Sequence, residues 1–193
     1  ADIYGIDISE EMLRVLKDKI EPEDHNRVSQ QNITNFSLNN RFSLIIAPFR
    51  VFSHLITIED QLQALNNIYK HLVPGGTFIF DLFVPDLNIL SKGLDNEIDF
   101  EKEYEPGRVI RRLVDMKTDI IRQVNHIKIS LVWIDDDGEH FESWEFPMRY
   151  YFRYELEHLV ARSPMVIEKI YGDYNKNLLN TDSKEFIVVC KKP

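Results

Sequence analysis

Strand-like and helix-like segments alternate through the first half of the chain, and this alternation constrains the fold more than any other feature of the sequence. Apolar runs at residues 3–8, 42–47 and 77–83 have the length and composition of buried strands. Two segments between them, residues 9–20 and 57–72, have apolar side chains at helical spacing. Such alternation is typical of a mainly parallel sheet with right-handed helical crossovers. We therefore expect an α/β fold.

The pattern changes after residue 83. Apolar and polar residues alternate with a period of two from residue 100 to residue 152, and the Asp-Asp-Asp-Gly sequence at residues 135–138 is typical of a hairpin turn. We expect an antiparallel β-sheet inserted into the α/β unit, as a separate subdomain over residues 84–147. Trp133 and Trp144 lie on opposite sides of the turn, and we expect them to pack across the strands.

The α/β pattern resumes after the insert. A helical segment at residues 154–162 is followed by two strand-like runs, 165–171 and 184–191, which we interpret as an antiparallel hairpin at the edge of the sheet. Residues 1–83 and 148–193 are thus predicted to form one core that carries the insert.

Composition argues against several kinds of partner. No apolar run approaches the roughly 20 residues that a membrane span needs, and a net charge of −9 argues against a basic face for a nucleic-acid backbone. The single cysteine, Cys190, lies in an apolar strand-like run, which indicates a core residue and excludes an internal disulfide. A chain of this kind fits the reducing cytoplasm.

Asp7 follows the first apolar run and precedes a segment with the features of a capped helix. In open α/β sheets, ligands bind outside the carboxyl ends of the strands, where an acidic side chain accepts hydrogen bonds from ribose hydroxyls. The same acid could instead only help to cap the following helix, with Ser9 as the predicted N-cap residue. The residues alone leave both interpretations open.

In combination, these segments resemble a class I S-adenosylmethionine-dependent methyltransferase of the small-molecule type with an antiparallel insert. The resemblance covers nearly the whole chain and rests on the order and spacing of short motifs. These are Gly5-Ile6-Asp7-Ile8-Ser9 with Glu11-Met12-Leu13, Asn32 near the end of a weaker strand at residues 27–36, residues 42–47 with the loop to His54-Leu55, Leu72-Val73-Pro74-Gly75-Gly76 before residues 77–83, and the aromatic-Arg-aromatic stretch at residues 150–154. The fold that it implies is a Rossmann-like sheet, mostly parallel, with an antiparallel C-terminal hairpin.

The resemblance also implies a function. The protein would use S-adenosylmethionine to methylate a small soluble acceptor at O or N by in-line displacement. Asp7 would hold the ribose hydroxyls, and Asn32, which stands where such proteins usually have Asp, would accept from the adenine amino group through its carbonyl oxygen. The other cofactor contacts implied are those of Ile8, Met12, Ile33, Ala47 and Phe49.

One departure from the family pattern is large. Such folds begin with a strand and a glycine-rich loop that wraps the methionine part of the cofactor, and here nothing precedes Ala1. That strand would lie between the two halves of the sheet, and without it two apolar strands would expose unpaired edges. We expect that the segment is missing only from this sequence; the alternatives are a partner that supplies it or a chain that does not bind the cofactor.

Two residues of the loop after residues 42–47 are candidates for catalysis. His54 could act as a general base, because the family's cofactor faces this loop, or it could simply pack at the start of the next helix. Arg50 could bind a carboxylate or phosphate of the substrate, or it could pair with an acid at the surface.

Four further side chains are candidates for substrate contacts: Asp81, Arg149, Tyr151 and Arg153. A buried carboxylate is costly unless it is paired, so we expect Asp81 either to face the pocket or to be satisfied by a neighbouring polar group. The other three mark the return of the insert to the core, where they could close over the substrate or form an ordinary solvated face. The histidines lack metal-ligand spacing, and no metal is predicted.

Two other functions stay open. One is a degenerate methyltransferase-like module that assembles with another chain and does not bind the cofactor, as the absent glycine-rich loop and Asn32 suggest. The other is a nicotinamide-dependent oxidoreductase, which would also use an acid after its second strand. The predicted partners are a small-molecule substrate and, as one option, a second copy of the chain, with no nucleic-acid or membrane partner.

Overall fold

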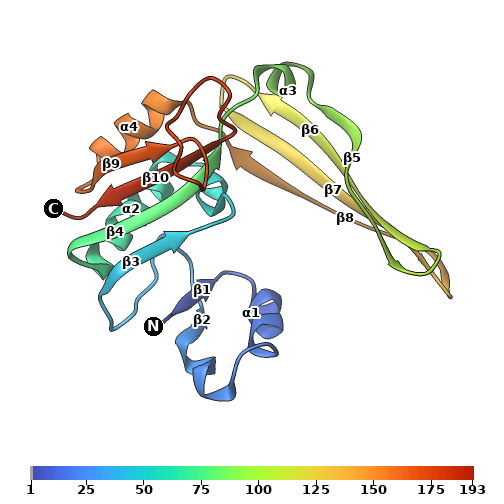
Figure 1. Cartoon of the computed structure of the whole chain (residues 1–193), viewed down its shortest axis with the longest axis horizontal. Coiled ribbons are helices and arrows are strands. Elements are labelled where there is room, and N and C mark those ends of the chain that lie inside the picture. Colours follow the sequence, from blue (N-terminus) through green and yellow to red (C-terminus); the bar gives the residue numbers. More distant parts are fainter. Residues whose placement is uncertain (1) are drawn as a thin grey trace.

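The computed structural model describes residues 2–193, which form an α/β core and a long antiparallel arm that projects from it (Figure 1). The core sheet has four strands in the order β3-β4-β10-β9. Their bounds are Phe42–Ala47 (β3), Leu72–Phe83 (β4), Val166–Tyr171 (β9) and Glu185–Lys191 (β10). β3 and β4 are parallel, whereas β10 is antiparallel to both of its neighbours. The mixed α/β architecture predicted from the sequence is confirmed.

The prediction that β9 and β10 form an antiparallel hairpin at the edge of the core sheet is confirmed, with β9 as the outer strand and β10 inside the sheet. β10 pairs with β4 on one side and with β9 on the other. Phe186 and Val188 of β10 are 4% and 0% exposed, and such an apolar strand is stable only when both its edges and its faces are covered. Cys190 is fully buried in the same strand, as predicted, and burial raises the pKa of its thiol to about 12.

Two helices pack against the core sheet. They are α2 (Ile58–His71) and α4 (Arg153–Ala161). Thr57 is the N-cap of α2, and its hydroxyl accepts a hydrogen bond from Asp60 N at 3.1 Å. Leu65 and Ile68 of α2 and Leu156 of α4 have no exposed surface and join one cluster with the apolar residues of β4 and β10. No helix within residues 2–193 combines the length and apolar character needed to cross a membrane.

The N-terminal segment forms a small sheet of its own. β1 (Gly5–Asp7) pairs in parallel with β2 (Val28–Gln30), and α1 (Glu10–Lys17) and the 3-10 helix η1 (Pro22–Arg27) connect them. β2 is shorter than the predicted strand at residues 27–36, because Asn32 Oδ1 accepts hydrogen bonds from the backbone and hydroxyl of Thr34, both at 2.9 Å, and forms a turn.

Because the β1–β2 sheet is separate from the core sheet, β3 is an outer strand of the structure described for residues 2–193. Leu44 and Ile46 of β3 are 52% and 59% exposed. The apolar run at residues 42–47 is predicted to be a buried strand, and within the described chain it has a paired neighbour on one side only.

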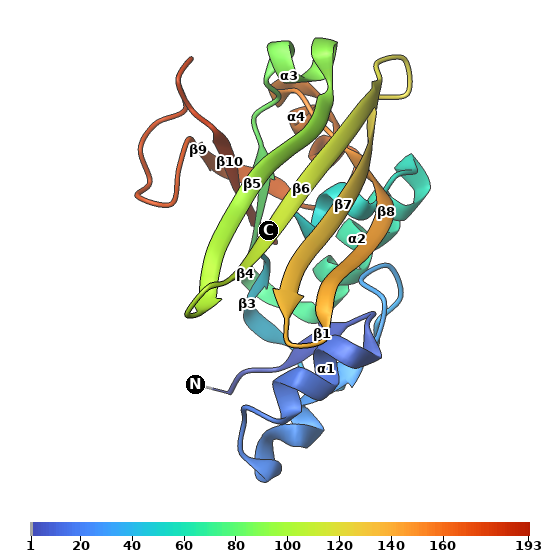
Figure 2. The ribbon, with the colours of Figure 1, turned by 90° about the vertical axis from the view of Figure 1, so that its right-hand side faces the viewer.

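The arm is a four-stranded antiparallel sheet in the order β5-β6-β7-β8 (Figures 1 and 2). Its elements are α3 (Leu87–Lys92), β5 (Leu94–Glu105), β6 (Arg108–Asp119), β7 (Val124–Asp135) and β8 (Gly138–Arg149). The alternating stretch was expected to begin at residue 100, but Leu94 already pairs with Met116. The hairpin turn after Asp135 is confirmed, with Asp135 paired to Gly138.

The two tryptophans of the arm do not oppose each other, so the prediction of a tryptophan pair is wrong. Trp133 lies opposite His140, and the two rings stack with centroids 5.1 Å apart. Trp144 lies opposite Ile129. The tight turn sets this register, because every pair in the ladder follows from Asp135 opposite Gly138.

Candidate functional site

Asp7 lies at the carboxyl end of β1, and its side chain is exposed to solvent. Its Oδ1 accepts a hydrogen bond from Ser9 N at 2.8 Å. Ser9 is the N-cap of α1, as predicted, and its hydroxyl accepts from Met12 N at 3.2 Å. The two interpretations of Asp7 are therefore compatible: one carboxylate oxygen supports the helix start, and the side chain still faces solvent.

Asn32 follows β2 and lies near Asp7, because Asp7 pairs with Gln30 in the parallel ladder. Gln30 itself donates from its side-chain amide to Ile8 O at 3.0 Å and so fixes the chain just after Asp7. Both hydrogen bonds from Thr34 end on Asn32 Oδ1. A carbonyl oxygen has two lone pairs and Thr34 uses both, so the expectation that this oxygen accepts from an adenine amino group does not hold, and the amide nitrogen is the part of Asn32 left for a ligand.

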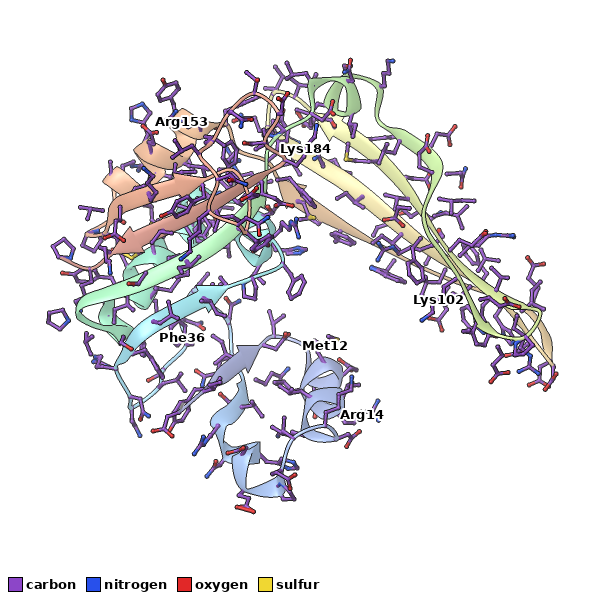
Figure 3. All side chains as sticks on the ribbon, viewed as in Figure 1. Met12, Arg14, Phe36, Lys102, Arg153 and Lys184 are labelled. Atoms are coloured by element: carbon purple, nitrogen blue, oxygen red, sulfur yellow. The ribbon has the colours of Figure 1, made fainter. Side chains whose placement is uncertain are left out.

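Three apolar side chains around these strand ends are strongly exposed. Ile8 is 68%, Met12 61% and Phe49 81% exposed. Figure 3 labels Met12 in α1, on the side of the small N-terminal unit that faces the arm. By contrast, Ala47 at the end of β3 is 5% exposed, and Ile33 packs against the core cluster. Exposed apolar residues beside a polar strand end are typical of a ligand-binding surface.

The chain makes a sharp corner after β3. Phe49 and Arg50 both have φ of 59°, in the left-handed region that residues other than glycine rarely adopt. This conformation costs about 1–2 kcal/mol per residue, so surrounding contacts must hold it. Arg50 is also the N-cap residue of the short 3-10 helix η2 (Val51–His54).

Arg50 is held by acidic side chains of two core strands. Its Nε lies 3.3 Å from Asp81 Oδ2, and its Nη2 donates to Glu185 Oε1. Its guanidinium carbon lies 4.0 Å from the centre of the Phe83 ring. Asp81 is 3% exposed. Burial raises the pKa of Glu185 above its ordinary value, against the opposing effect of Arg50.

His54 ends η2 and meets the arm at its base. Its ring centroid lies 5.6 Å from that of Phe146 in β8. Partial burial lowers the pKa of His54 below its ordinary value, so the imidazole is neutral near pH 7 and can accept a proton.

The three candidates at the end of the arm lie in different environments. Arg149 donates from Nη1 to Ile56 O and to Arg122 O, at 3.3 and 3.2 Å. Tyr151 is 2% exposed, and burial raises the pKa of its hydroxyl. Arg153 pairs with Glu157 along α4 at 2.9 Å, and Figure 3 shows it on the upper part of the core, well apart from Met12. The structure therefore does not gather these three residues around Asp7.

Two residues of the site region were not predicted from the sequence. Glu185 stands at the start of an apolar strand, a position that could have suggested a buried acid. Phe146 belongs to the alternating pattern of the insert, and no local feature indicates that it reaches His54. No group of three metal-ligating side chains is found within the described chain.

Residues 1–76 match the model of the family described as "Methyltransferase domain". A search of curated proteins finds no match.

Solved structures with a similar fold are methyltransferases. An S-adenosylmethionine-dependent methyltransferase from Clostridium acetobutylicum ATCC 824 has 21% identity and a TM-score of 0.78, over 97% of this chain and 74% of that one. The CcbJ methyltransferase from Streptomyces caelestis has 20% identity and a TM-score of 0.77, over 98% and 79%. CalS10, an amino pentose methyltransferase from Micromonospora echinaspora, has 17% identity and a TM-score of 0.73, over 98% and 73%.

The chain has the fold of the class I S-adenosylmethionine-dependent methyltransferases, as its sequence motifs predicted. The match of the first 76 residues includes the segment that contains Asp7, Asn32 and Phe49.

Proposed function

We propose that this protein transfers a methyl group from S-adenosylmethionine to the oxygen or nitrogen of a small-molecule acceptor. The observation that supports this most directly is the exposed carboxylate of Asp7 at the carboxyl end of β1, beside the turn of Asn32. In a sheet of this type, that position is where a ribose is held.

The residues present fit the cofactor. Asp7 has one carboxylate oxygen engaged by Ser9 and a side chain that is open to solvent, as an acceptor for a diol must be. Ile8 and Met12 offer an exposed apolar surface for a purine, and Asn32 would donate to the ring from its amide nitrogen. The backbone of Ile33 would meet the ring edge, while Ala47 and Phe49 would line the methionine end.

The bound cofactor would supply an electrophilic methyl group on a sulfonium. The chain's own task is then to align the acceptor, exclude water and accept a proton. His54 is our candidate base, because it is neutral near pH 7 and lies on the loop after β3. Phe146 beside it brings an apolar surface of the arm to the same place.

The acceptor class is proposed from two supports. Structures with a similar fold include an amino pentose methyltransferase, a sugar N-methyltransferase and a glycopeptide N-methyltransferase. The chain's charge of −9 disfavours a nucleic-acid acceptor. Arg149, Tyr151 and Arg153 stay proposed as acceptor contacts only in a rearranged arm. Arg149 and Arg153 have their present partners within the protein, and the Tyr151 hydroxyl is buried without a hydrogen-bond partner.

A second copy of the chain is our proposed protein partner. Ile129 and Trp144 lie opposite each other on one side of the arm, and the next pair on that side is Ile127 with Phe146. Trp144 is 44% exposed. Two β-sheets that pack face to face through apolar side chains of this kind can form the core of a dimer. We also propose a cytoplasmic location, in keeping with the single buried thiol of Cys190.

Calorimetric titration with S-adenosylhomocysteine tests the proposal, on residues 1–193 and on any longer native chain that contains them. Asp7→Ala should weaken binding roughly tenfold or more, because charge-assisted hydrogen bonds to a diol are lost. Asp2→Ala is the matched control, since Asp2 is an exposed acid just before β1 that pairs with Arg27 at 3.5 Å.

The alternatives predict other outcomes of the same titration. Binding of NAD in place of S-adenosylhomocysteine would favour the oxidoreductase. If neither ligand binds to either form of the chain, the module without cofactor is favoured and the proposal fails.

A further inference from the structure

The Arg50 side chain is enclosed by the protein itself. Asp81 and Phe83 approach it from β4 and Glu185 from β10, and the whole side chain is 18% exposed. Glu185 and Phe83 are paired in the β4–β10 ladder, so the two strands together form one binding site for the guanidinium. Glu185 accepts a hydrogen bond from this cation, and Asp81 lies against it as a second negative charge without a hydrogen bond to Nε.

Asp81 also contacts the backbone of the corner after β3. Asp81 Oδ1 lies 3.4 Å from Arg50 N, while its Oδ2 faces Arg50 Nε. Asp81 therefore contacts the main chain and the side chain of one residue. Arg50 and Phe49 before it both have left-handed backbone angles, and the two contacts of Asp81 stabilise this conformation.

The corner sets the position of His54. Arg50 O accepts the first hydrogen bond of η2, from Ser53 N at 2.8 Å, and Leu55 N donates to Phe52 O at 3.2 Å. With only one helical turn between Arg50 and His54, a change at the corner moves the imidazole directly. His54 in turn contacts Phe146 of the arm.

We propose that Asp81 and Glu185 are positioning residues, which act through Arg50 to hold the Phe49–His54 corner in the shape that presents His54 beside Phe146. This assigns Arg50 and Asp81 an internal role in place of direct substrate contacts. The catalytic meaning of the corner rests on the proposed function, but its geometry does not.

Proton NMR titration of the His54 ring tests this role without an acceptor. His54→Gln identifies the signal by its loss. In the native chain the pKa of His54 should lie below the ordinary value, because the ring is partly buried. Asn tolerates left-handed backbone angles well, so Arg50→Asn removes the guanidinium without adding backbone strain. In this variant the corner should open, and the pKa of His54 should rise toward the ordinary value. Arg50→Lys should give an intermediate value, because one ammonium cannot bridge both acids as a guanidinium does.

The arm offers a matched control. Arg112 contacts both oxygens of Asp99 at 2.8 Å and lies 5.9 Å from the Phe100 ring, but this cluster is on the surface, far from η2 in sequence. Arg112→Asn should leave the His54 titration unchanged. Glu185→Gln keeps the Asp81 contact, so it provides a milder variant if Arg50→Asn does not fold, and it should shift the His54 pKa in the same direction by less.

An unchanged His54 pKa in folded Arg50→Asn or Glu185→Gln, with only the melting temperature lowered, would overturn the inference. An equal shift in Arg112→Asn would also overturn it. Failure of the native chain to bind S-adenosylhomocysteine refutes the proposed function alone, since the His54 titration does not depend on the cofactor.

Discussion

β4 of the core and β7 of the arm are strands of equal length with a paired neighbour on each side, yet their environments differ completely. Phe78, Phe80 and Leu82 of β4 are at most 1% exposed, whereas Ile129 and Trp133 of β7 are only half-buried. The difference comes from the next layer: α2 and α4 join the core cluster, while most of the arm projects away from the helices of the core (Figure 1). Hydrogen-bonded pairing alone thus shapes a strand, but burial requires a second layer.

The ion pairs of the two regions differ in the same way. Arg111 with Glu101 and Arg112 with Asp99 bridge β6 and β5 at the surface of the arm. Arg50 with Asp81 lies within the core, between a loop and two strands. Surface pairs contribute little to stability, whereas breaking one partner of a buried pair is costly. The same kind of substitution should therefore lower the free energy of unfolding more in the core than on the arm.

Removal of a large side chain should show the largest contrast. Phe80→Ala should lower the free energy of unfolding by about 3–5 kcal/mol, because it leaves a cavity among buried residues. Phe141→Ala in β8, where the side chain is 61% exposed, should change it by less than about 0.5 kcal/mol. Urea denaturation of both variants measures the difference. Similar losses in the two variants would contradict the comparison and indicate that something covers the arm. If the loss in Phe141→Ala depended on protein concentration, the cover would be a second copy of the chain.

Removal of an arginine should give the next largest contrast. Arg50→Met leaves Asp81 and Glu185 near each other without their cation, and we expect a loss of about 3 kcal/mol in the free energy of unfolding. Arg112→Met on the arm should cost less than about 1 kcal/mol. Denaturation at pH 7 compares the two, and an equal cost for both would mean that the core acids are satisfied without Arg50.

Local signals predicted much of this site. The apolar run before Asp7, the cap Ser9 and the turn at Asp135 all act over a few residues, and each was found where the sequence indicated. The opposition of Trp133 and His140 was also within reach, because a two-residue turn fixes the whole register.

The environment of Arg50 could not be predicted in this way. Asp81 lies 31 residues from Arg50 along the chain and Glu185 lies 135 residues away, and the second contact exists only because β10 enters the sheet beside β4. The position of β10 depends on long-range burial and has no local pattern. The sequence showed that Arg50 and Asp81 each needed a partner, but not that they were partners of each other.

The pH dependence of stability should be the smallest contrast and should have opposite signs in the two regions. Burial raises the pKa of Glu185 in the folded core, so the stability that its protonated form contributes below pH 4.5 is lost as the pH rises through the raised pKa. On the arm, the hydrogen bond with His140 lowers the pKa of Asp135, so its contribution is present above pH 3.8 and is lost as the pH falls.

Unfolding measured between pH 3 and pH 7 separates the two effects. Relative to the native chain, Glu185→Gln should gain stability as the pH rises, and Asp135→Asn should gain stability as the pH falls. Equal slopes for the two variants would mean that both carboxylates experience the same environment, against the burial that distinguishes β10 from the tip of the arm. Because Arg50 opposes the effect of burial on the pKa of Glu185, Arg50→Met alone should raise that pKa further and extend the Glu185 slope to higher pH, whereas the slope of Asp135 should stay the same.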